Sequence, residues 1–136
     1  MRITITPTGG KAFVLADEAT GAMVQDGFRP GQTRLTQSQA LFRAPYKTNL
    51  PRFNLENRLR FVVERTFATM EAALSFIATH ADQVPVQGTV TLYHATARGQ
   101  TSRSLPGAVV TDIQCLEHIG VSCRFQYTVA GNSAWQ

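Results

Sequence analysis

The chain has 136 residues, of which 43% are hydrophobic and 16% are charged, and its net charge is +4. This size and composition are typical of one globular domain that buries its own core, and they exclude a globally disordered chain. No apolar run approaches the roughly 18 residues of a membrane span, and no apolar segment of a secretory signal follows Met1. We therefore expect a single domain over residues 1–136 that has no membrane partner.

The N-terminal part predicts two short strands followed by a long irregular segment. Residues 2–6 alternate isoleucine with polar residues, the turn sequence at 7–10 ends that strand, and residues 11–16 predict a second strand. Glycine and proline then interrupt the apolar pattern over residues 17–51. Because long loops in compact domains are usually functional or disordered, we expect an extended arm at 17–51 that a neighbouring molecule orders.

The central part, residues 58–92, predicts a strand, a helix and another strand. Residues 58–67 alternate at strand spacing, Thr69 is a suitable N-cap for a helix over residues 69–81, and Gly88 opens the next alternating segment. The helix carries an apolar stripe that we expect to face the sheet, while Phe76 lies outside it. The members of the stripe are Met70, Ala73, Leu74, Ile77 and Ala81.

The C-terminal part predicts a β-hairpin of residues 108–116 and 119–129 that turns at 117–120. Its second strand is expected to bury one face, made of Ile119, Val121, Cys123, Phe125, Tyr127 and Val129. The tail at 130–136 is expected either to fray or to be used for contacts, since only Trp135 gives it a reason to dock. The order of elements predicts an α+β, mainly β fold, an antiparallel β-sandwich or partly closed barrel with one helix packed on it.

The sequence contains no motif that is typical of an active site or a metal centre. Cys115 and Cys123 lack zinc-site spacing, and we expect them to be reduced core residues, with a disulfide as the alternative. The three histidines fit no zinc-enzyme motif, and we expect His80 to interact with the negative end of the helix dipole. We therefore expect no enzymatic activity, no catalytic residue, no cofactor and no metal.

Positive charge is concentrated in the middle of the chain. Residues 29–65 hold eight of the 13 basic residues but only two acidic ones. Such a cluster can contact phosphates or acidic proteins, or it can be an ordinary solvated face. We expect an interface with a partner at Arg29, Arg34, Arg43, Lys47, Arg52 and Phe53.

A set of positions in the second half resembles small tail proteins of long-tailed bacteriophages and prophages. The resemblance covers about half of the chain, residues 58–131, and consists of structural positions. The residues that carry it are Arg58, Phe61, Val63, Arg65, Phe67, Thr69, Ala73, Phe76, His80, Val84, Pro85, Gly88, Val90 and Leu92. In this family they fall in a strand, a helix and a second strand, and a hairpin like that of residues 108–129 follows.

The resemblance implies a β-sandwich or barrel with one helix that closes into homo-oligomeric rings and grips the next ring with long loops. It implies a non-enzymatic structural protein whose partners are itself and other tail proteins. Its location would be the bacterial cytoplasm during assembly and the virion tail afterwards. The lumens of such tubes are commonly acidic where they face DNA, whereas this chain is basic.

Two other function classes remain open from the sequence. One is a small barrel that binds single-stranded nucleic acid, because aromatic residues are interleaved with the basic ones. Its contacts would be Arg43, Lys47, Arg52, Arg58 and Arg60. The other is a small enzyme or ligand-binding barrel, which would require a cavity with converging polar groups.

Overall fold

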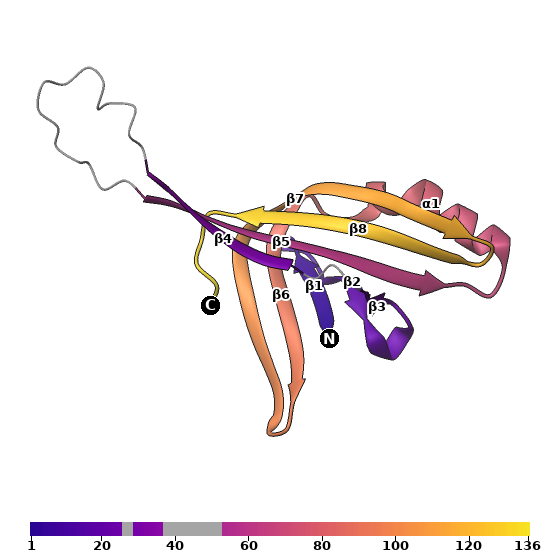
Figure 1. Cartoon of the computed structure of the whole chain (residues 1–136), viewed down its shortest axis with the longest axis horizontal. Coiled ribbons are helices and arrows are strands. Elements are labelled where there is room, and N and C mark those ends of the chain that lie inside the picture. Colours follow the sequence, from indigo (N-terminus) through magenta and orange to yellow (C-terminus); the bar gives the residue numbers. More distant parts are fainter. Residues whose placement is uncertain (26–28, 37–52) are drawn as a thin grey trace, which may run out of the picture.

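The computed structural model describes residues 1–25, 29–36 and 53–136, and it has a mainly β architecture with one α-helix (Figure 1). This confirms the predicted fold class. The elements in chain order are β1 (Arg2–Thr6), β2 (Phe13–Asp17), the 3₁₀ turn η1 (Glu18–Thr20), β3 (Met23–Val24), β4 (Arg29–Thr36), β5 (Phe53–Thr66), α1 (Met70–Gln83), β6 (Gln87–Thr96), β7 (Gly99–Ile119) and β8 (Ser122–Gly131).

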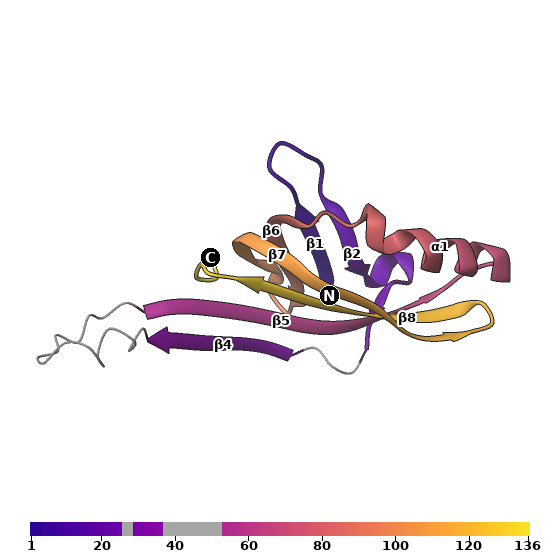
Figure 2. The ribbon, with the colours of Figure 1, turned by 90° about the horizontal axis from the view of Figure 1, so that it is seen from above.

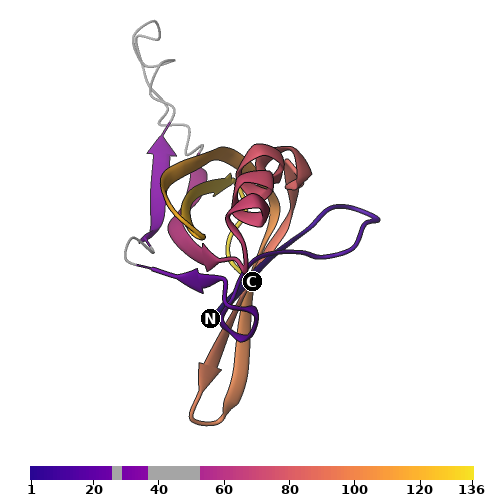
Figure 3. The ribbon, with the colours of Figure 1, turned by 90° about the vertical axis from the view of Figure 1, so that its right-hand side faces the viewer.

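The strands form one antiparallel sheet that curls into a nearly closed barrel. Its order is β2-β1-β6-β7-β8-β5-β3, and β4 pairs with β5 beside β3. The two ends of this order, β2 and β3, are joined by η1 and by a bridge between Asp17 and Ala22. Viewed from the end, the sheet curves around α1, which lies against its concave side (Figure 3).

Strand alternation builds the core. In β8 the residues Cys123, Phe125, Tyr127 and Val129 are buried, as predicted. Ile119 and Val121 were expected on the same face, but they are 67% and 36% exposed. The last β7–β8 pair joins Ile119 to Ser122, so Ile119 and Val121 lie at the hairpin turn and not in the buried part of the strand pair.

The helix begins as predicted, because the Thr69 hydroxyl accepts a hydrogen bond from the Ala72 amide at 3.2 Å. The predicted apolar stripe is wrong at Met70, Leu74 and Ala81, whereas Ala73 and Ile77 do face the core. Met70 and Leu74 are 49% and 47% exposed. The helix is instead rotated towards a face on which Ala73 and His80 are buried and Phe76 and Ile77 pack against the core. Small Ala73 allows close approach, and the rings of Phe76 and His80 occupy the concave side of the sheet.

Three further expectations concern the segment at 17–51, the cysteines and the tail. Residues 18–20, 23–24 and 29–36, within the segment expected to be irregular, form η1, β3 and β4, because backbone pairing with β5 needs no apolar periodicity; residues 26–28 and 37–51 lie outside the described residues, and the arm stays a prediction. Cys115 is exposed, and only Cys123 belongs to the core; both are free thiols. Of the two alternatives for the tail, contact rather than fraying is observed, since Gln136 forms two backbone hydrogen bonds of 2.8 Å with Ser104.

The alternation in β8 predicts a sharp contrast between neighbouring residues. Phe125 is 3% exposed and touches two aromatic rings of α1, whereas Gln126 points to the outer face. Phe125→Ala should lower the free energy of unfolding by about 3–5 kcal/mol, and Gln126→Ala by less than about 0.5 kcal/mol. Urea unfolding curves measure both, and equal stabilities would contradict the assignment of faces.

Candidate functional site

A two-stranded ribbon of β4 and β5 projects from the barrel (Figures 1 and 2). The part of β5 from Asn57 to Thr66 pairs with β8 on one edge. Residues 53–56 continue past the end of β8, and within the described ranges they pair only with β4. The ribbon therefore leaves the barrel as an extension of one of its own strands.

Among the described strands, β4 has an open outer edge. β4 pairs with β5 over eight positions, from Arg29 opposite Arg60 to Thr36 opposite Phe53. On its other side, no strand pairs with β4 among the residues that the structure describes. An open strand edge presents unpaired N–H and C=O groups that can pair with another chain.

The predicted interface residues fall partly on this ribbon. Arg29 and Arg34 belong to β4, and Phe53 begins β5. Of the residues proposed for nucleic acid, Arg58 and Arg60 are exposed on β5. The remaining predicted residues lie outside the described residues; they are Arg43, Lys47 and Arg52.

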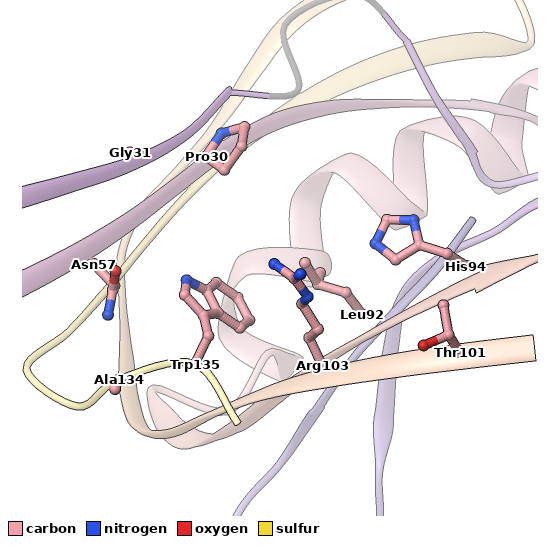
Figure 4. Close-up of a pocket in the computed structure, with 9 residues that line it drawn as sticks. All are labelled: Pro30, Gly31, Asn57, Leu92, His94, Thr101, Arg103, Ala134 and Trp135. Atoms are coloured by element: carbon pink, nitrogen blue, oxygen red, sulfur yellow. The ribbon is translucent and has the colours of Figure 1, made fainter.

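A cavity of about 660 Å³ opens at the base of the ribbon, and the sequence analysis did not predict it (Figure 4). One wall comes from cross-strand pairs of β6 and β7, Leu92 with Arg103 and His94 with Thr101. Each strand contributes residues two positions apart, so all four lie on one face of the hairpin. The other lining residues are Pro30 and Gly31 of β4, Asn57 of β5, and Ala134 and Trp135 of the tail.

The tail is fixed on both sides of Trp135. The side-chain amide of Asn57 donates a hydrogen bond to the carbonyl of Ser133, and Gln136 pairs with Ser104 of β7. These two anchors hold the indole ring of Trp135 beside Arg103 in the cavity (Figure 4). The sequence signal that could have indicated this wall is the i, i+2 spacing of Leu92 and His94 and of Thr101 and Arg103.

His80 does not have the predicted role at the helix end. The side chain of His80 is 1% exposed and stacks on Phe76, with ring centroids 4.3 Å apart. A hydrogen bond joins its Nε2 atom to the Tyr127 hydroxyl. Burial, together with the positive charge of Arg65, lowers the pKa of His80 to about 4. Burial raises the pKa of Tyr127 to about 12. Both groups are therefore neutral at pH 7 and serve as core residues.

The described residues contain no group of three or more histidine, cysteine or acidic side chains that could hold a metal ion. Within the same ranges, no helix has the length and apolar character needed to cross a membrane. Comparison of the chain with protein-family models, with curated proteins and with solved structures found no match.

The neutral state of His80 predicts acid sensitivity. The unfolded chain takes up the proton near pH 6.5, but the folded chain does so only near pH 4. The contribution of neutral His80 to the free energy of unfolding is therefore fully present above about pH 6.5 and is lost as the pH falls towards about 4. Between about pH 7.5 and about pH 5, the free energy of unfolding should drop by about 2 kcal/mol from this group.

Denaturant melts at the two pH values measure this loss. His80→Gln should remove the pH-dependent part, although the variant is less stable at both values. His118→Gln is the matched control, because His118 lies beside the β7–β8 turn and its Nε2 hydrogen bonds to the nearby Gly120 carbonyl. An unchanged pH dependence in His80→Gln would contradict the assignment.

Proposed function

We propose that this protein is a non-enzymatic structural component of a phage or prophage tail that assembles by ring-like self-association, with the β4–β5 ribbon making contacts between rings. The observation that carries the proposal is the ribbon with its open β4 edge. The resemblance of residues 58–131 to small tail proteins supports the same function. A barrel with one helix agrees with the fold that this resemblance implies.

The energetics of the ribbon favour an assembled state. An isolated two-stranded ribbon is marginally stable in water, and ordering its backbone costs about 1–2 kcal/mol per residue. Residues 53–56 have no strand on their other side within the described part of the chain. Pairing of a neighbour's strand with the β4 edge would satisfy its backbone groups and offset this cost.

The alternative function, a barrel that binds single-stranded nucleic acid, is favoured by one observation. The register places Arg29 opposite Arg60, two positions along the ribbon from the pair of Gly31 and Arg58. Basic residues at neighbouring positions of a strand pair can contact the phosphates of a nucleic acid. Binding of a single-stranded oligonucleotide that falls steeply with salt, without self-association, would support this alternative.

A charged edge should block self-association without harming the barrel. Thr33→Lys with Leu35→Lys places two lysines on β4, the device by which natural edge strands avoid pairing. The matched control, Gln100→Lys with Ser102→Lys, adds the same charge at the same spacing to exposed positions of β7. We expect the native and control proteins to form larger species as concentration rises, and the β4 variant to stay monomeric.

Sedimentation velocity and negative-stain electron microscopy measure the assembly, and thermal melting verifies the fold. We expect the same melting temperature for monomers of all three proteins, because β4 lies outside the barrel's order of strands. Rings formed by the β4 variant as readily as by the native protein would remove the β4 edge from the interface. A native protein that stays monomeric at all concentrations would contradict self-association.

A further inference from the structure

The wall of the cavity at the base of the ribbon contains a buried acceptor. Asn57 is 1% exposed, and its Oδ1 atom accepts no hydrogen bond from any residue that the structure describes. Its amide nitrogen is directed towards the tail, where it binds Ser133, and the oxygen lies on the opposite side (Figure 4). An unsatisfied buried acceptor is costly, and a ligand with an N–H or O–H donor would satisfy it.

The same cavity presents a positive charge. Arg103 is exposed on β7, lines the cavity, and forms no ion pair with any described residue. None of the described lining residues is acidic, and His94 and Thr101 add further polar groups to the same wall. A guanidinium group binds carboxylates through paired hydrogen bonds. The charge of the cavity therefore suits an anion.

The remaining lining is apolar. The indole ring of Trp135 and the side chains of Leu92 and Pro30 provide a surface for a hydrophobic group. A volume of about 660 Å³ falls within the range of small-molecule sites and exceeds the needs of a simple inorganic anion. Apolar walls with a few converging polar groups are the usual design of such sites.

We propose that this cavity binds an organic carboxylate that also carries an N–H donor and an apolar group, the chemistry of an N-acylated amino acid or of the last residue of a peptide. The carboxylate would bind Arg103, the amide N–H would donate to Asn57 Oδ1, and the apolar group would contact Trp135. The inference does not depend on self-association, because the cavity is lined by one copy of the chain.

The single tryptophan of the chain makes the site directly observable. N-acetyl-leucine and a short peptide that ends in leucine are titrated against Trp135 fluorescence, and we expect a saturable change. Binding of both probes identifies the shared chemistry, whereas binding of the peptide alone identifies a polypeptide as the source. The amide of N-acetyl-leucine, which has no carboxylate, should bind about tenfold more weakly or worse.

A protein variant and a modified probe test the two polar contacts separately. Arg103→Gln should weaken binding by about tenfold or more, and the control Arg98→Gln, an exposed arginine at the tip of the same hairpin, should not. A probe methylated on its amide nitrogen should also bind about tenfold more weakly, because Asn57 Oδ1 then stays unpaired. Thermal melting shows that both variants are folded.

Two results would overturn the proposal. One is the absence of a saturable fluorescence change with either probe up to about 10 mM, because a weaker affinity would not indicate a specific site. The other is equal affinity of the native protein and Arg103→Gln. Equal affinity of the methylated and unmethylated probes would overturn the assignment of the N–H donor to Asn57.

Discussion

The side chain of Arg65 reinforces the closure of the barrel. From the end of β5, its Nη2 atom donates a hydrogen bond of 2.6 Å to the backbone carbonyl of Leu15 in β2. Its guanidinium also lies over the ring of Phe76 in α1, 4.9 Å from the centroid. One side chain thus connects the two sides of the sheet opening and the helix. Its charge also helps to keep His80 neutral beneath them.

A fixed β5 explains where the two functional features lie. The second half of β5 pairs with β8 and β3, so its first residues leave the barrel in a defined direction. β4 pairs with these first residues and projects along with them. Asn57 stands at the point of departure and anchors the tail. The ribbon and the cavity are therefore neighbours because both begin where β5 leaves the barrel.

The sequence predicts what local periodicity controls and misses what depends on distant contacts. Alternation identified β8 and its buried Phe125 and Tyr127, and the Thr69 cap located the start of α1. The rotation of α1 was not predictable from its own residues, because the rings that receive Phe76 and His80 belong to other elements. The cavity joins β4, β5, β6, β7 and the tail, so no single segment revealed it.

Hydrogen–deuterium exchange tests most directly whether the β4 edge is an assembly surface. Amide exchange in β4 (Arg29–Thr36) is compared between dilute and concentrated protein, with the interior strand β8 as an internal reference. The account predicts that β4 exchanges rapidly in dilute protein and becomes protected on assembly, while β8 is protected in both states. Assembled protein in which β4 exchanges as rapidly as in the dilute state would contradict it.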